Sequence, residues 1–259
     1  MSLFAPADPG VPGGINCSDP VPGRGESDSQ ASPCRACPTR VACTARDLEE
    51  NTLDAFGSCI DISPVLQRND YLYRPGDPGN GCYVVRSGVF KSVSITPSGE
   101  EYVTGFHYPG EVLVLTGEAT GSHDDCAVAL TASTACAIPH RVFHQVFNIG
   151  AGDSLLRLLA ERECNNRELE NNLRQSRAEA RIAGFLVLLM RRLERLGFDS
   201  ALLPLPMSRT DLANHLGLTL ECLSRALGKW KRADIISTEK DRIAINQPAM
   251  LLTLADHLG

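Results

Sequence analysis

Residues 208–230 read SRTDLANHLGLTLECLSRALGKW, with two helix-capping signals on either side of one glycine. Ser208 can cap a first helix, and Asp211 in its first turn suits the positive end of the helix dipole. Gly217 ends that helix, and Thr219 can cap a second one. Apolar residues recur at helical spacing along both, namely Leu212, Ala213, Leu216, Leu220, Leu223, Leu227 and Trp230. Two short helices joined by a glycine turn predict a helix-turn-helix.

The polar face of the second helix carries Glu221, Ser224 and Arg225 near its N-terminal end. That end is where a recognition helix contacts base edges. Arg225 can bind guanine through two hydrogen bonds, Glu221 can accept from a cytosine amino group, and Ser224 can serve either kind of partner. A solvated helix face would also carry such charges, but it would not need paired caps and a short turn. We therefore predict double-stranded DNA as the partner.

Residues 234–245, DIISTEKDRIAI, alternate apolar and polar side chains around a charged turn. This pattern predicts a small hairpin, or wing, behind the second helix. Candidates for phosphate contacts, which position a protein without reading sequence, are Lys229, Lys231, Arg232 and Lys240. Residues 1–150 carry 17 of the 31 acidic side chains but only 9 of the 25 basic ones, so the C-terminal part is the more cationic one in a chain of net charge −6.

Residues 60–147 contain short β-branched and aromatic runs broken by Gly and Pro, a pattern typical of an antiparallel sandwich or roll. TPSGEE at 96–101 predicts a hairpin, because Pro97 presets φ and Gly99 can adopt positive φ. Residues 47–57 have the spacing of a short helix that leads into this domain. Residues 1–33 are rich in Pro, Gly and Ser and predict a disordered tail.

From Asp153 onward, more than forty residues lack Pro and contain only Gly184 as a glycine, which predicts a long helix or two in succession. Alternating steps of four and three residues define a coiled-coil seam whose apolar members include Leu155, Leu159, Leu169 and Leu173. Arg162, Asn166 and Ser176 interrupt it, and buried polar groups weaken an interface. We therefore expect a homodimer whose formation is conditional. The alternative is a helix that packs only on its own domain.

Composition excludes several classes of protein. No apolar run approaches the roughly 18 residues that cross a bilayer, and the N-terminus lacks an export signal, so we expect a cytoplasmic protein without a membrane span. No Ser–His–Asp arrangement, phosphate loop or catalytic pair of carboxylates stands out, which argues against an enzyme. Ten cysteines in a cytoplasmic chain point instead to metal binding or redox sensing.

Three of these cysteines, Cys34, Cys37 and Cys43, lie in CRACPTRVAC with C-x2-C-x5-C spacing. Thiolates on one short loop can converge on a metal centre, which needs a fourth ligand. Zinc and iron–sulfur clusters both accept four thiolates, and the spacing alone leaves both open. A thiol redox sensor without metal is the third alternative.

RSGVFKSVSITPSGEEYVTGFHYPGE (86–111) and GLTLECLSRALGKW (217–230) resemble the CRP/FNR regulators, and specifically the FNR branch, in a match covering residues 34–246. The resemblance implies an α+β fold. A cysteine cluster loop (34–46) would precede an antiparallel β-roll sensor domain of the cyclic-nucleotide-binding type (47–150). A dimerisation helix (151–186) and a C-terminal winged helix-turn-helix domain (187–259) would follow.

The resemblance also implies a site and a role. Cys136, in TACAIP, would complete the ligands of an oxygen-sensing [4Fe–4S] cluster, and Glu-x-x-Ser-Arg would read a TTGAT-type half-site. RNA polymerase would be a further partner. The alternative is that Cys136 is simply a core residue, with Cys17 and Cys126 as substitute ligands. Cyclic AMP is not expected, because Asp124 and Asp125 place carboxylates where relatives bind its phosphate. An iron–sulfur electron carrier is the competing class, although it would leave the helix-turn-helix without a purpose.

Overall fold

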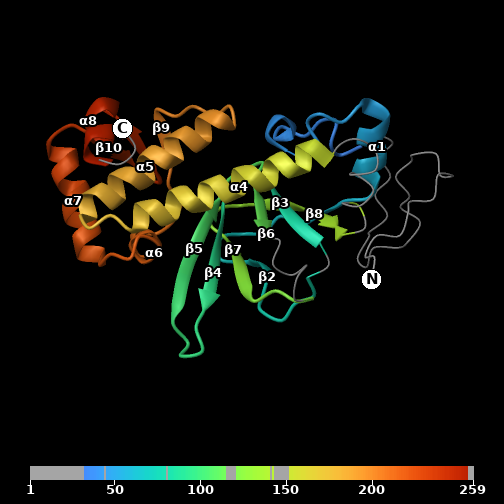
Figure 1. The fold of residues 1–259 in the computed structure, drawn as a ribbon, viewed down its shortest axis with the longest axis horizontal. Coiled ribbons are helices and arrows are strands. Elements are labelled where there is room, and N and C mark those ends of the chain that lie inside the picture. Colours follow the sequence, from blue (N-terminus) through green and yellow to red (C-terminus); the bar gives the residue numbers. More distant parts are fainter. Residues whose placement is uncertain are drawn as a thin grey trace, which may run out of the picture.

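The computed structural model describes residues 32–43, 45–79, 81–114, 121–140, 142 and 152–255. Most of the predicted disordered tail, residues 1–31, lies outside these ranges. The cysteine segment comes first and leads into helix α1 (Glu50–Ser58), which confirms the short helix expected there. Figure 1 shows this segment and α1 at one end of the molecule, and the C-terminal helices at the other.

Two four-stranded antiparallel sheets form the β-roll, in the orders β1-β8-β3-β6 and β2-β7-β4-β5. The strands are β1 (Asp61–Ile62), β2 (Tyr71–Tyr73), β3 (Gly81–Ser87), β4 (Phe90–Ile95), β5 (Glu101–His107), β6 (Val112–Val114), β7 (Asp125–Ala129) and β8 (Thr134–Pro139). Val85, Phe90 and Leu113 are among the fully buried residues of one of its cores. The predicted antiparallel roll is confirmed.

The expected hairpin joins β4 to β5, with Ile95 opposite Glu101. Gly99 has a φ of +85°, and its N–H donates to the Thr96 carbonyl over 2.9 Å, which closes the turn. The hairpin projects from the body of the molecule (Figure 1).

Two helices follow, α4 (Gly152–Leu173) and α5 (Ala178–Arg195). Asn172 is fully buried at the break between them, and its side-chain amide donates to the Arg181 carbonyl over 2.9 Å. Ala180 and Ala183 continue the heptad spacing of the seam but are buried inside their own chain. Within the described residues, the part of the seam free to meet another chain therefore ends with α4.

Residues 178–255, called the reading unit below, combine α5 with β9 (Leu202–Pro204), α6 (Arg209–His215), α7 (Leu220–Arg232), β10 (Ile236–Glu239), β11 (Arg242–Ile245) and α8 (Pro248–Ala255). Ser208 and Asp211 form a reciprocal capping box on α6, and Thr219 Oγ1 accepts from the Cys222 N–H at the start of α7. Gly217 turns the chain between them with a φ of +61°. The predicted helix-turn-helix is confirmed.

The wing is a three-stranded sheet. β10 and β11 pair antiparallel, as expected, and turn at Lys240, which has a φ of +48°. β9, which the sequence pattern did not reveal, adds a third strand through pairs such as Ala244 with Leu202. Among the described residues, no helix combines the length and apolar content that crossing a membrane requires.

The reading unit is docked on the edge of the β-roll. Asn214 of α6 accepts from the Val103 N–H over 2.7 Å and donates to the Glu101 carbonyl over 2.9 Å. Lys91 of β4 forms an ion pair with Asp211 at 2.5 Å, with both side chains largely buried. One continuous apolar core runs from the sheet that contains β5 into α5, α6 and α7.

Two leucines on α7 test how this core is built. Leu223 is fully buried, whereas Leu220, expected on the same apolar face, is 47% exposed. We expect Leu223→Ala to lower the free energy of unfolding by about 2–5 kcal/mol through lost contacts and a cavity. Leu220→Ala should change it by less than about 0.5 kcal/mol. Urea unfolding followed by circular dichroism measures both, and equal losses would contradict the burial described here.

Candidate functional site

The cysteine loop, residues 34–46, is a succession of tight turns. The Cys37 N–H donates to the Cys34 carbonyl over 3.4 Å, and the Cys43 N–H donates to the Arg40 carbonyl over 3.0 Å. A single turn of 3-10 helix, Arg40–Ala42, lies between Cys37 and Cys43. These turns fold three cysteines of one short segment back toward each other.

An arginine anchors the loop to α1. The Arg35 guanidinium makes two parallel hydrogen bonds to the Asp54 carboxylate, at 2.7 and 2.5 Å, and a third to Glu50 at 3.3 Å. Leu48 and Leu53 are buried in the same apolar cluster as Cys34, which packs the loop against α1. Arg35 was not among the predicted site residues, because its partners lie 15 and 19 positions away in a segment without a recognisable motif.

All four predicted cysteines line one small cavity between the loop and the β-roll. Cys34, Cys37 and Cys43 come from the loop, and Cys136 comes from β8, where it pairs with Val84 of β3. The alternative ligand Cys126 lies elsewhere: it is buried on β7, with its thiol directed to the Val93 carbonyl at 3.6 Å. Cys17 is outside the described residues. The structure therefore brings together the set that includes Cys136.

Burial and the neighbouring thiols favour the protonated form of Cys34 and Cys136. Burial, followed by the nearby Cys43, raises the pKa of Cys136 to about 12. Burial, followed by Cys43 and Cys37, raises the pKa of Cys34 to about 11. Arg86 acts in the opposite sense on both. Thiolates gathered in an apolar cavity repel each other, so a bound cation would replace the protons.

The thiols surround the cavity rather than converge on one point. In the part of the chain that the structure describes, no group of three or more His, Cys, Asp or Glu side chains is gathered closely enough to hold a metal ion. Zinc requires its ligands at about 2.3 Å from a single ion. A [4Fe–4S] cluster distributes four thiolates over four irons, and this donor set of four thiols suits it.

The three residues expected to read bases are exposed together on α7. The side chains of Glu221 and Arg225 are 70% and 79% exposed and form an ion pair at 2.5 Å. Ser224 is exposed beside them. This face of α7 therefore exposes hydrogen-bond donors and acceptors to solvent next to each other.

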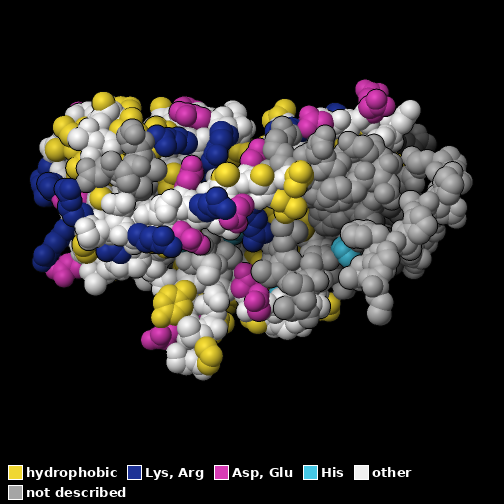
Figure 2. Space-filling model, viewed as in Figure 1, with side chains coloured by type: hydrophobic (Ala, Val, Ile, Leu, Met, Phe, Trp, Pro, Cys, Tyr) yellow, Lys and Arg dark blue, Asp and Glu magenta, His cyan; other side chains and the backbone are white. Residues whose placement is uncertain are grey.

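The candidate phosphate contacts differ in their surroundings. Lys229 forms an ion pair with Glu179 of α5 at 2.8 Å, and Lys231 donates to Thr238 of β10 at 3.3 Å. Arg232 and Lys240 are exposed at the end of α7 and at the tip of the wing. Figure 2 shows Lys and Arg side chains gathered at the end of the molecule that α7 forms.

The predicted seam residues lie on α4. Leu159 and Leu169 are half-buried, and Leu173 is 37% exposed. The side chain of Leu155 lies outside the described residues. Leu169 and Leu173 line a cavity of about 760 Å³ between α4, the β-roll and the reading unit.

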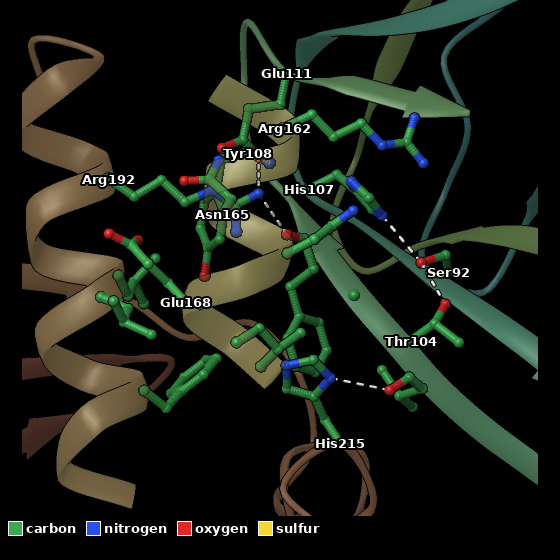
Figure 3. Close-up of a pocket in the computed structure, with 18 of the residues that line it drawn as sticks. Ser92, Thr104, His107, Tyr108, Glu111, Arg162, Asn165, Glu168, Arg192 and His215 are labelled. Atoms are coloured by element: carbon green, nitrogen blue, oxygen red, sulfur yellow. Dashed lines mark hydrogen bonds and ion pairs between the residues drawn. The ribbon is translucent and has the colours of Figure 1, made fainter. Parts of the chain in front are cut away.

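That cavity occupies the place where the resemblance would put an effector, and Figure 3 shows its polar lining. Glu111 is not free there, because its carboxylate forms a buried ion pair with Arg192 of α5. On the opposite side, Ser92 bonds both His107 and Thr104, at 3.0 and 2.8 Å. Asp125 also lines the cavity, and burial raises the pKa of its carboxyl group.

We therefore expect cyclic AMP not to bind. The Glu111 carboxylate is already paired, and Asp125 would repel a phosphate. At 1 mM ligand, a site with a Kd of about 10 µM would add about 2.7 kcal/mol of stability. Thermal unfolding with and without cyclic AMP should give the same Tm, with 5′-AMP as a control for non-specific effects. A rise in Tm specific to the cyclic nucleotide would contradict this expectation.

Comparison with known proteins agrees with this architecture. Residues 64–149 match the model of a cyclic nucleotide-binding domain, and residues 180–254 match that of a Crp-like helix-turn-helix domain. The chain is 31% identical to the transcriptional activator protein Anr of Pseudomonas protegens, over 92% of this chain and 97% of the relative. It is 30% identical to the fumarate and nitrate reduction regulatory protein of Salmonella typhimurium, over 90% and 94%.

Among solved structures, FixK2 from Bradyrhizobium japonicum is similar, with a TM-score of 0.65 and 25% identity over 75% of this chain and 96% of that one. A cyclic nucleotide-binding-type β-roll followed by a helix-turn-helix domain is thus shared in order and in fold. The chain belongs to the CRP/FNR family of transcription regulators.

Proposed function

We propose that this regulator responds to oxygen through a [4Fe–4S] cluster held by Cys34, Cys37, Cys43 and Cys136. At low oxygen it binds a TTGAT-type, near-palindromic DNA site as a homodimer. The gathering of four thiols around one cavity is the observation that carries the proposal. The names of the relatives support a response to low oxygen. One from Pasteurella multocida, 32% identical over 89% of this chain, is called an anaerobic regulatory protein.

The residues of the loop would do most of the work of sensing. When bound, an iron–sulfur cluster supplies a centre that oxygen can destroy. The four thiols lose their protons to hold it, and the loop is then fixed to β8 through Cys136 as well as to α1 through Arg35. Without a cation, the raised pKa values of Cys34 and Cys136 keep these thiols neutral, and the attachment of the loop to β8 through Cys136 is lost.

DNA binding would use two copies of α7. In a two-fold dimer joined along α4, through Leu155, Leu159, Leu169 and Leu173, the recognition helices must lie about 34 Å apart to enter successive major grooves. Glu221, Ser224 and Arg225 would read the half-site. Lys231, Arg232 and Lys240 would bind phosphates, joined by Lys229 when it leaves Glu179. RNA polymerase would be a further partner of the DNA-bound dimer.

Iron and sulfide analysis tests the cluster. Protein purified without oxygen should be brown and contain about four iron and four sulfide per chain, and its colour should bleach in air. Cys136→Ser should lose most of the iron, because the loop thiols cannot supply the fourth ligand. The matched control is Cys164→Ser, on the exposed face of α4, which should retain it.

A colourless anaerobic protein that contains about one zinc per chain would overturn the cluster and favour the zinc alternative. A metal-free protein whose DNA affinity follows thiol oxidation would favour the thiol sensor. A brown protein without sequence-specific DNA binding would favour the electron carrier.

Base reading is tested on Arg225. Arg225→Ala removes a bidentate contact to guanine and should cost about 1–3 kcal/mol on the TTGAT-type site and little on a scrambled duplex. Lys231→Ala should weaken binding to both duplexes alike and reduce the salt dependence. Arg68→Ala, which removes an exposed charge from the β-roll, serves as the control. Fluorescence anisotropy at several salt concentrations measures all three, and an unchanged preference in Arg225→Ala would contradict its assigned role.

A further inference from the structure

The cysteine loop touches the β-roll at a turn that does not carry a cysteine. Ala42, which directly precedes Cys43, is buried against Gly110. A Cβ atom on Gly110 would lie 2.5 Å from Ala42 Cβ and 3.1 Å from its carbonyl oxygen. Gly110 also has a φ of +92°, a conformation that side chains rarely allow. The two backbones are therefore in direct contact, and Ala42 cannot move toward the roll without displacing this turn.

The turn is a rigid unit. The Gly110 N–H donates to the Val85 carbonyl over 2.8 Å, and the Val85 N–H donates to the Glu111 carbonyl over 2.9 Å. The Tyr108 N–H donates to the Glu111 carboxylate over 2.7 Å. Backbone and side chain of Glu111 are thus held together, so a displacement of Gly110 carries the carboxylate with it.

The same turn is attached to the reading unit. Arg192 of α5 donates through two nitrogens to the Glu111 carboxylate, and through one of them also to the Phe106 carbonyl over 2.7 Å. The Tyr108 hydroxyl, on a fully buried ring, donates to the Pro204 carbonyl of β9 over 3.0 Å. Figure 3 shows Arg192 reaching from α5 to Glu111 beside the large cavity. A buried bidentate ion pair tolerates little change in geometry.

A second docking contact lies apart from this path. Lys91 and Asp211 join β4 to α6 by an ion pair, and neither residue belongs to the loop or to the turn at Gly110. It holds the reading unit to the β-roll, and neither of its residues lines the cavity of the four predicted cysteine ligands. It therefore offers a matched control for an interdomain ion pair of the same kind.

We infer that Gly110, Glu111 and Arg192 couple the state of the cysteine loop to the orientation of the reading unit within one chain. The path runs from Cys43 through Ala42 to the turn and from there to α5, without passing through α4. Glu111 and Arg192 are positioning residues, because neither is placed to touch DNA or a thiol ligand. The inference deepens the proposed function, on which it rests for the meaning of the signal, but the coupling itself requires no particular metal.

Coupling between two sites is reciprocal in free energy, so DNA on the reading unit must shift the equilibrium between conformations of the loop, and the reactivity of its thiols reports that shift. The test measures the rate of N-ethylmaleimide addition to Cys43 in the full-length, metal-free, reduced protein, with and without a duplex carrying the TTGAT-type site. Because this form should bind DNA more weakly than the loaded protein, concentrations are raised until fluorescence anisotropy shows that the duplex is bound. Mass spectrometry of the Cys43 peptide gives the rate. We expect DNA to change it about fivefold or more in the unmodified chain. Arg192→Met should reduce that effect to less than about twofold.

Arg192→Met leaves Glu111 buried without its partner and could unfold the chain. The double variant Glu111→Gln with Arg192→Met removes both charges and should show the same loss of coupling. Lys91→Met should keep the full DNA effect, and Arg192→Lys should restore part of it. A DNA effect that persists in the double variant, or that disappears equally in Lys91→Met, overturns the inference.

A second measurement needs no DNA. Alkylation of the loop thiols should alter hydrogen exchange of the backbone amides at 186–195 in the unmodified chain but not in the double variant. The same exchange in both proteins, before and after alkylation, overturns the inference. Failure of the proposed function would give a different result. If the protein holds zinc in place of iron, or shows no preference for the TTGAT-type duplex, the expected effect of alkylation on hydrogen exchange is unchanged.

Discussion

The open edge of the β-roll fixes where the reading unit sits. β5 is the last strand of its sheet, so its outer N–H and C=O groups have no partner strand. Asn214 satisfies one of each, accepting from Val103 and donating to Glu101, and the Val103 carbonyl lies 2.9 Å from His215 Nδ1. Because these side chains belong to the first helix of the helix-turn-helix, the direction of α7 follows from this edge.

An ion pair made by the same helix, α6, also holds the reading unit on the β-roll. Asp211 serves both as the partner of Ser208 in the capping box and as the partner of Lys91 across the domain contact. Burial alone would raise the pKa of its carboxyl group, but hydrogen bonds from Lys91 and Ser208 lower it below the usual value. A lowered carboxyl pKa contributes stability that is present above the unfolded value and is lost as pH falls through the folded one. The docking contact is therefore secure at neutral pH and sensitive to acid.

Local patterns in the sequence predicted most of the elements and only part of the site. The capping box, the glycine turn and both hairpins depend on residues within a few positions of each other. The prediction that Leu220 belongs to the apolar face was wrong, since its side chain is exposed. Helical side chains tilt toward the N-terminus, and a residue of the first turn has no preceding turn to cover. Arg192 and Asn214 could not be found this way, since their partners lie 81 and 111 residues away.

The cysteines divide in the same manner. The spacing of Cys34, Cys37 and Cys43 is enough to predict them as ligands, whereas Cys136 is predicted only through the family resemblance. The pairing of β8 with β3 brings Cys136 to the cavity. Arg35 and Arg86, which position the loop and act on its thiols, carry no motif. Their roles depend on the tertiary fold.

The ion pair between Lys229 and Glu179 bears on how the protein recognises a polyanion. A lysine that binds a phosphate drives affinity by releasing a condensed counterion from the duplex. To bind a phosphate, Lys229 would first have to break its ion pair with Glu179 of its own chain. That cost would be the same for every duplex, because phosphate contacts carry no sequence information, so it would lower the affinity for DNA without changing the preference between sequences.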